Sequence, residues 1–163
     1  ILSKIHHPNI LSAYHMYVID DIISYTMPVA KGGDLHQYIS YHFQKKRMLF
    51  EEKIRDILKQ LLEALKYVHG LNIVHRDISP ENIFFLDSQC ENICLADFEF
   101  ACDVRYIKDF AGKSAYMAPE MHKQKMCLYF HRKIFFNNKV KKWPFDRLLT
   151  KNIFLFFNNK TNT

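Results

Sequence analysis

The clearest pattern in the chain is an amphipathic stripe between Glu51 and His69. Its apolar residues follow one another at spacings of three, one, three, one, three and three positions: Ile54, Ile57, Leu58, Leu61, Leu62, Leu65 and Val68. This period predicts a helix that buries one face and turns the other toward water. Gly70 and Asn72 follow, and both residue types often adopt the left-handed backbone that ends a helix. We expect the stripe to be core packing without chemistry of its own.

Shorter patterns predict strands on both sides of this helix. Apolar, β-rich runs from residue 10 to residue 27 flank the pair Asp20-Asp21, which favours a turn, so this segment is predicted to be a β-hairpin. Two further short strands are predicted at 83–86 and 93–96, with a polar turn between them.

Two more helical segments are expected near the start. Residues 1–10 end in a segment with Pro8, which cannot continue a helix, and are predicted to be the last turns of a helix and the connection after it. Asp34 stands before the run 35–41, where a carboxylate can cap the first turn of a helix. Helices and short strands together predict an α+β fold.

The charge of the chain is unevenly distributed. The net charge is +6, but residues 1–120 hold 13 Lys and Arg against 16 Asp and Glu, whereas residues 121–163 hold 10 against one. The basic segment is rich in Lys, Asn and Phe and shows no period, so we expect an irregular tail. Either it is a divergent interaction tail, or it is translated non-coding sequence, which we favour. Its aromatic residues follow no nucleic-acid recognition motif, so a nucleic-acid partner is not expected.

Cysteine usage and hydropathy indicate the cellular compartment and bear on membrane association. The four cysteines lack paired metal-ligand spacing and the density of a secreted disulfide scaffold, so we expect free thiols in a reducing, intracellular compartment, the cytoplasm. They are Cys90, Cys94, Cys102 and Cys127. No apolar run approaches the ~20 residues that a membrane span needs, and no membrane partner is expected.

Three motifs carry the chemistry. Residues 75–82 read His-Arg-Asp-Ile-Ser-Pro-Glu-Asn, Asp97-Phe98-Glu99 begins fifteen residues after Asn82, and Ala118-Pro119-Glu120 closes the stretch. An acid that orients a hydroxyl, followed by an amide and a second acid that hold magnesium, is what phosphoryl transfer from a nucleotide needs. In this order and spacing the motifs resemble the eukaryotic protein kinases, and the residues around Pro80 and Pro119 resemble the serine/threonine branch.

The resemblance implies a partial kinase-like fold. Residues 1–27 would be a remnant of the small lobe, with the hairpin of its fourth and fifth strands. Residues 28–120 would be the hinge and a partial large lobe with the catalytic loop and the activation segment, and residues 121–163 are not kinase-like. A kinase has two lobes, so the chain is expected to be a piece of a longer protein, with the glycine-rich loop, the strand Lys and its Glu partner before residue 1.

The resemblance also implies an ATP site. Adenine would bind the hinge at Met27, at the carbonyl of Pro28 and at the amide of Ala30, and the proline costs nothing where only an acceptor is used. Asp34 matches the acid that meets the ribose, although it can equally be a helix cap. With Glu81 it would favour basic residues in a protein substrate by charge pairing.

In the resemblance Asp77 is the catalytic acid that orients the substrate hydroxyl. Asn82 and Asp97 would bind Mg²⁺, since hard oxygen ligands suit that metal. The alternative for each is a loop cap or a turn residue. Glu99 stands where the family has Gly, which would restrict the backbone of the segment.

Two positions depart from the serine/threonine branch. Ser79 stands where a Lys usually reaches the transferring phosphate, and Lys113 stands where a Thr is usual. We hypothesise a compensated exchange of ammonium and hydroxyl; the alternative is a pseudokinase that acts as a binding or scaffold module. In the family Arg76 pairs with a phosphorylated residue, and Asp109 matches that position, either to order the segment or as an ordinary exposed acid. Isolated, the chain is expected to transfer little or no phosphate.

Overall fold

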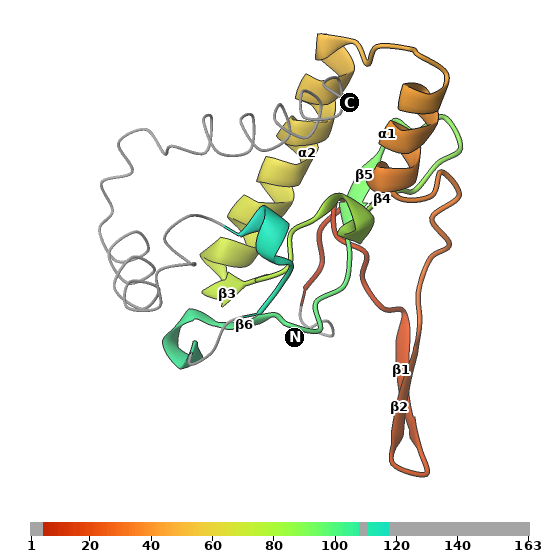
Figure 1. The fold of residues 1–163 in the computed structure, drawn as a ribbon. Coiled ribbons are helices and arrows are strands. Elements are labelled where there is room, and N and C mark those ends of the chain that lie inside the picture. Colours follow the sequence, from red (N-terminus) through yellow and green to blue (C-terminus); the bar gives the residue numbers. More distant parts are fainter. Residues whose placement is uncertain (1–4, 108–110, 118–163) are drawn as a thin grey trace. The chain divides into compact units, whose positions relative to one another are not determined.

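The computed structural model describes residues 5–107 and 111–117. The chain divides into two units, Ile1–Tyr106 and Ile107–Thr163. The first unit has an α+β architecture (Figure 1). Its elements are β1 (His15–Ile19), β2 (Ile22–Thr26), α1 (Leu35–Gln44), α2 (Glu51–Gly70), β3 (Ile73–Val74), β4 (Ile83–Phe85), β5 (Ile93–Leu95) and β6 (Cys102–Asp103), with short 3₁₀ helices at Pro80–Asn82 and Val104–Tyr106. In the second unit a 3₁₀ turn covers Ser114–Tyr116.

Helix α2 confirms the predicted amphipathic helix. It packs on β5 and β3, and its buried residues are Ile57, Leu61, Ala64, Leu65 and Val68. Leu62 belongs to the predicted stripe but is 41% exposed, because it lies roughly 120° around the helix from the centre of the buried face. Gly70 was expected past the end and is instead the last helical residue, whereas Asn72 has the left-handed backbone (φ 59°).

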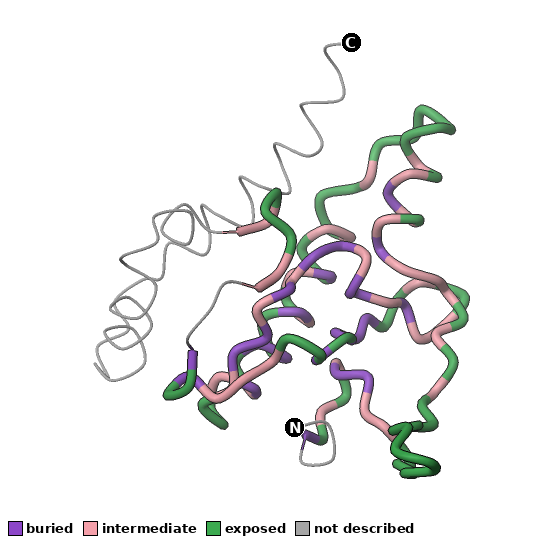
Figure 2. Tube along the Cα trace, turned by 60° about the horizontal axis from the view of Figure 1, so that its bottom comes forward, coloured by how far each residue is buried: buried purple, intermediate pink, exposed green. Residues whose placement is uncertain are grey.

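A continuous backbone ladder runs through the centre of the first unit. β4 and β5 pair antiparallel with Ile83 opposite Leu95, each strand one residue shorter than predicted. The free edge of β5 bonds to the segment 9–11, and the free edge of β4 bonds to the segment 31–33. Figure 2 shows the buried positions gathered at the centre of this unit. The ladder therefore joins four segments that are far apart in sequence.

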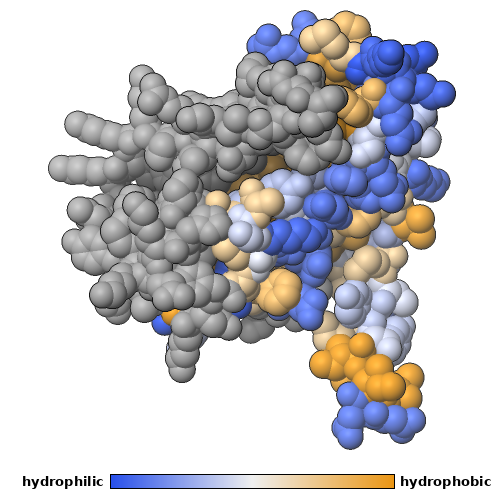
Figure 3. Space-filling model, in the orientation of Figure 1, coloured by the Kyte–Doolittle hydropathy of each residue, from blue (hydrophilic) through white to orange (hydrophobic). Residues whose placement is uncertain are grey.

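The predicted hairpin is confirmed as β1 and β2. Asp20 and Asp21 both have positive φ, 50° and 62°, as a two-residue hairpin turn that matches strand twist requires. All ten strand residues are exposed. One face is wholly apolar and consists of Met16, Val18, Ile23 and Tyr25, each 48–69% exposed. In Figure 3 the β1–β2 hairpin, at the lower right, carries a patch of hydrophobic colour.

Other parts of the structure differ from the sequence-based expectations. Residues 5–7 are not helical, because the residue before Pro8 is biased toward extended backbone; residues 1–4 lie outside the described part. β3 and β6 pair antiparallel and were not predicted. Helix α1 is confirmed and runs three residues past the predicted end at residue 41.

Two expectations about the setting concern the cysteines and the membrane. Cys90, Cys94 and Cys102 are free thiols, and burial raises the pKa of Cys94 to about 12. Cys127 lies outside the described residues. Within the described residues, no helix combines the length and hydropathy needed to cross a bilayer.

Candidate active site

The β4–β5 hairpin sets the spacing of two predicted metal ligands. Asn82 immediately precedes β4, and Ala96 immediately follows β5. The N–H of Ala96 donates to the main-chain oxygen of Asn82 at 2.8 Å, which extends the ladder by one pair. Asp97 is the next residue along the chain. The register of the hairpin therefore brings Asn82 and Asp97 to the same end of the β4–β5 pair.

Asn82 is also tied to the predicted catalytic acid. Its Nδ2 donates to the main-chain oxygen and to Oδ2 of Asp77, both at 2.8 Å. Asp77 is 6% exposed and Asn82 is 7% exposed, so these bonds are shielded from water. Both partners are acceptors, and this identifies the amide atom that faces them as the nitrogen. The side-chain oxygen of Asn82 is thus the amide atom that can coordinate a cation.

The ring of His75 is hydrogen-bonded to the backbone of both Ala96 and Asp77. Its Nε2 lies 2.9 Å from the carbonyl oxygen of Ala96, and its Nδ1 accepts from the N–H of Asp77 at 3.3 Å. The carbonyl requires a proton on Nε2 and the amide requires a lone pair on Nδ1, so the ring is the neutral Nε2–H tautomer. The ring of Phe98 packs edge-on against it, with centroids 4.6 Å apart.

The electrostatics of His75 agree with a neutral ring. It is 1% exposed, and burial lowers its pKa from the ordinary value of 6.5. The hydrogen bond to Ala96 and the carboxylates of Asp77 and Asp97 oppose this shift, in that order of size, without reversing it. Both acids therefore lie near enough to act on the same ring.

Backbone strain is present at two motif residues. Arg76 has φ 68° and Asp97 has φ 60°, a left-handed conformation that costs a residue with a side chain roughly 1–2 kcal/mol. Arg76 Nε donates to the carbonyl of Phe100 at 2.6 Å, and Asp97 Oδ1 accepts from the N–H of Glu99 at 3.3 Å. Glu99 itself is not among the residues with positive φ, so its side chain creates no left-handed strain in this conformation.

The two departures from the family pattern lie in different units. Ser79 is 2% exposed, and its carbonyl accepts from the N–H of Asn82 at 3.0 Å, so it belongs to the turn that carries Asn82. Lys113 is exposed and belongs to the second unit, and Asp109 lies outside the described residues. The exchange of Ser79 and Lys113, and the pairing of Arg76 with Asp109, remain predictions.

The segment predicted to be the hinge is hydrogen-bonded directly to β4. Gly32 N–H donates to the carbonyl of Phe85 at 3.0 Å, and Phe85 N–H donates to the carbonyl of Gly33 at 2.9 Å. A Cβ on Gly32 would lie 2.4 Å from the carbonyl oxygen of Asp87, so only glycine allows this approach. Immediately upstream, Met27 is exposed and both Pro28 and Ala30 are half-buried. The ladder thus connects the predicted adenine-binding segment to the strand that follows Asn82.

The acids predicted to contact ribose or substrate are placed as follows. Asp34 Oδ1 accepts from the N–H of Gln37 at 2.7 Å, which confirms the helix cap. Its role at the ribose remains a prediction. Glu81 is half-buried in the 3₁₀ turn Pro80–Asn82.

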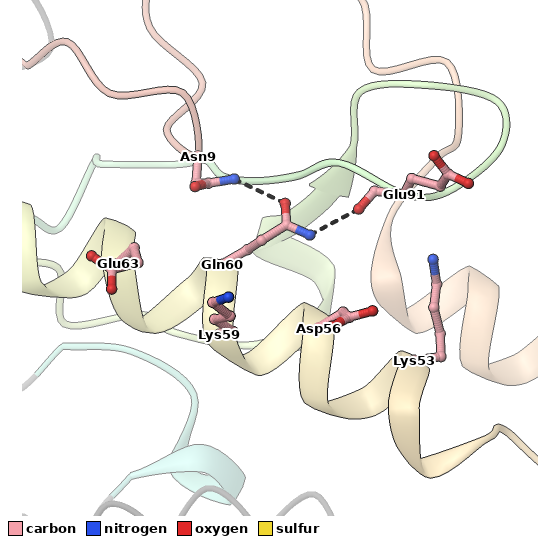
Figure 4. A pocket seen from close by; sticks show the side chains of 7 residues that line it. All are labelled: Asn9, Lys53, Asp56, Lys59, Gln60, Glu63 and Glu91. Carbon is pink, nitrogen blue, oxygen red and sulfur yellow. Dashed lines mark hydrogen bonds between the residues drawn. The ribbon is translucent and has the colours of Figure 1, made fainter.

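Sequence reasoning missed a polar clamp between α2 and β5. Gln60 Oε1 accepts from Asn9 Nδ2 at 2.9 Å and from the N–H of Ile93 at 3.0 Å, while its Nε2 donates to the carbonyl of Glu91 at 2.8 Å. Figure 4 shows this amide between the helix and the two segments that it joins, beside an open polar groove. A polar residue between Ile57 and Leu61 was the available signal. Gln60 is a positioning residue, because it anchors the strand that leads to Asp97.

Comparison with known proteins matches these features to one family. The sequence model described as "Protein kinase domain" matches residues 1–131. A probable serine/threonine-protein kinase of Dictyostelium discoideum is 39% identical over 131 residues, 78% of this chain and 27% of that protein. NUAK family SNF1-like kinase 1 of Homo sapiens is 36% identical over 124 residues, 74% of this chain and 18% of that protein. The liver/testis gamma catalytic chain of phosphorylase b kinase of Homo sapiens is 33% identical over 123 residues, 74% of this chain and 29% of that protein. The chain thus spans less than a third of the length of these relatives, and it belongs to the protein kinase domain family.

Proposed function

We propose that the chain carries the catalytic loop of a protein kinase that transfers the terminal phosphate of ATP to serine and threonine hydroxyls of proteins. One observation carries the proposal. The buried amide of Asn82 donates two hydrogen bonds of 2.8 Å to Asp77, and its main-chain oxygen accepts from the N–H of Ala96, the residue directly before Asp97. The name of the Dictyostelium discoideum relative supports the serine/threonine class.

The proposed roles follow from the chemistry of each group. Asp77 accepts a hydrogen bond from the substrate hydroxyl and orients it toward the phosphate, which is the main demand of a loose, anionic transition state. The side-chain oxygen of Asn82 and the carboxylate of Asp97 are the hard ligands that Mg²⁺ prefers, and that ion usually shares its shell with water and phosphate. Bound there, Mg²⁺ would neutralise charge on the phosphates.

The hinge residues complete the proposed nucleotide site. The carbonyl of Pro28 and the amide of Ala30 would hold adenine, with Met27 beside them. Asp34 would meet the ribose while its Oδ1 continues to cap α1. Asp34 and Glu81 together would favour substrates with basic residues near the target hydroxyl.

The test is phosphate transfer from labelled ATP to a basic protein substrate, in the full-length protein. Asp77→Asn should lower the transfer rate roughly 100-fold or more and leave ATP affinity nearly unchanged. Asp97→Asn should weaken ATP binding only when Mg²⁺ is present. Asp56→Asn, an exposed acid on α2, is the matched control and should change neither quantity. ATP binding without transfer would instead support the scaffold role.

The buried position of Ser79 motivates a second test, of the proposed exchange with Lys113. If Lys113 supplies the charge and Ser79 the hydroxyl, Ser79→Lys and Lys113→Thr should each lower the transfer rate, and the double variant should recover it. Lys113→Thr removes a positive charge that contributes several kcal/mol beside the transferring phosphate in a site closed to water, so its loss should be easy to measure, whereas Ser79→Lys removes the hydroxyl. Losses that simply add in the double variant would refute the exchange.

The same proposal predicts that this chain alone is inactive. The proposed catalytic loop and the proposed hinge lie among the described residues, whereas in the family pattern the strand Lys and its Glu partner come before the residues that this chain matches. The purified 163-residue chain should therefore transfer no phosphate above background. Turnover by that chain would show that the missing groups are not needed.

A further inference from the structure

The turn that joins α1 to α2 combines exposed apolar side chains with three consecutive cations. Residues 43–50 read Phe-Gln-Lys-Lys-Arg-Met-Leu-Phe, and we call this segment the basic turn. Met48 is 89% exposed, Phe50 is 81% exposed and Phe43 is 51% exposed. These are among the most exposed large apolar residues of the described chain outside the β1–β2 hairpin. Apolar groups of this size rarely gather at a protein surface without a binding role.

The backbone of the basic turn is ordered by hydrogen bonds. Lys46 N–H donates to the carbonyl of Phe43 at 3.0 Å, and Arg47 N–H donates to the carbonyl of His42 at 2.9 Å. This is the double closure that ends many helices, and it needs a left-handed residue at the position of Lys46, where glycine is preferred. Lys46 has φ 52°. The chain thus keeps a lysine where a glycine would relieve strain, which points to a use for its charge.

The acids nearest in sequence, all within the described part of the chain, do not cancel the positive charge. Residues 45–55 contain five Lys and Arg against two Glu. Of these acids, Glu51 pairs with Arg55 at 2.8 Å, so its charge is already partly balanced within the first turns of α2. Figure 1 shows the turn beyond the ends of α1 and α2, away from β3 and β6. Figure 3 shows apolar and hydrophilic side chains side by side at this end of the helices.

We propose that the basic turn is a contact site for anionic membrane surfaces. A bilayer rich in phosphatidylserine offers phosphate and carboxylate groups to the cations and, directly beneath these headgroups, hydrocarbon to Phe43, Met48 and Phe50. A projecting turn fits a plane, whereas an acidic peptide would leave the apolar side chains in water. The proposal revises the expectation of no membrane partner, which rested only on the lack of a spanning segment.

The experiment is co-sedimentation of the 163-residue chain with vesicles of phosphatidylcholine alone or with about 30% phosphatidylserine. Binding should need the anionic lipid and weaken as salt is raised. The triple variant Lys45→Gln, Lys46→Gln, Arg47→Gln should lose on the order of a hundred-fold in partitioning. The matched control Lys31→Gln, Lys59→Gln, Lys66→Gln removes the same charge from other exposed positions and should bind almost normally. Equal losses in both variants would overturn the proposal, because general charge would then account for binding.

A second variant tests the apolar half of the site without threatening the fold. Phe50 is the N-cap of α2 and makes no side-chain cap bond, so serine there should favour the helix. Met48→Ser with Phe50→Ser should weaken vesicle binding roughly ten-fold or more. An unchanged affinity would overturn membrane contact. Binding of a polyglutamate peptide that depends on the three cations, together with vesicle binding that does not, would assign the turn to an acidic protein instead.

Discussion

Replacing Asn82 with aspartate would exchange one amide nitrogen for an oxygen and keep the size of the side chain. In the folded chain that nitrogen donates to the main-chain oxygen and to Oδ2 of Asp77, at 2.8 Å each. An ionised carboxylate only accepts hydrogen bonds, so the new side chain could donate to neither oxygen. Asn82→Asp therefore sets oxygen against oxygen at two buried contacts.

The magnitude can be worked from these two bonds. A hydrogen bond to a neutral carbonyl contributes about 1 kcal/mol and one to a carboxylate about 2 kcal/mol, so their loss lowers the free energy of unfolding by about 3 kcal/mol. Repulsion between the two carboxylates adds to this loss. Asn82→Ala removes the same donors without a second charge and should destabilise the chain less than Asn82→Asp.

Urea unfolding followed by the helical circular dichroism signal measures these differences. Asn72→Asp is the matched control, because Asn72 is exposed and its left-handed backbone also suits aspartate. We expect the control to change the free energy of unfolding by less than about 0.5 kcal/mol. If Asn82→Asp proves as mild as Asn72→Asp, the two hydrogen bonds do not hold Asp77, and the reasoning from the site fails.

Three further predictions concern stability and are read in the same unfolding assay. Gly32→Ala should destabilise the chain by roughly 1–3 kcal/mol, because the new Cβ would meet the carbonyl oxygen of Asp87 at 2.4 Å. Gly70→Ala is the control and should be neutral or stabilising, because a Cβ there would have no atom within 4 Å. Equal effects of the two variants would contradict the close approach at Gly32. Lys46→Gly should stabilise the chain by about 0.5–1 kcal/mol by relieving its left-handed backbone, and a loss of stability would show that the turn is not strained. Because burial lowers the pKa of His75 from 6.5, the unfolded chain binds a proton that the folded chain does not, so the stability that His75 contributes is present above pH 6.5 and is lost as the pH falls below it. His75→Gln should flatten this part of the pH profile relative to the parent chain, and an identical slope would assign the dependence to other groups.

The helices were predictable because their signals are local. The stripe in α2 gave the right limits within one residue, since each large apolar residue reports its own position on the helix. Ala64 is buried but was not included in the stripe, because its small side chain adds little to a hydrophobic pattern. The pattern does not show which side of a wide apolar stripe packs against the core. Leu62 lies on the side that faces away from the core and is exposed.

The short strands and the strained residues were harder to predict from the sequence. β3 and β6 have two residues each, too few for any alternation, and their pairing joins Ile73 to Asp103 across thirty positions. Arg76 and Asp97 adopt left-handed backbone without the glycine that normally announces it. Such conformations are imposed by surrounding contacts, so local propensity does not reveal them.

The candidate site was partly predictable from motif order. The resemblance named Asp77, Asn82 and Asp97. The structure joins the first two by hydrogen bonds and bonds Ala96, the residue before Asp97, to Asn82, while the catalytic and metal-binding roles of the three remain predictions. The tautomer of His75 could not be anticipated, because it depends on the carbonyl of Ala96, twenty-one residues away. The clamp made by Gln60 was hidden for a similar reason, since an amide on a helix usually faces water.

The hairpin between Asn82 and Asp97 has a consequence for the assembly of the site. The two residues are fifteen positions apart, so closing the loop between them costs little chain entropy and can occur early in folding. The exposed tip at Ser88 and Gln89 lies outside the paired strands. Insertions there would lengthen the loop without shifting the register, so the spacing between Asn82 and Asp97 is insulated from length variation at the surface.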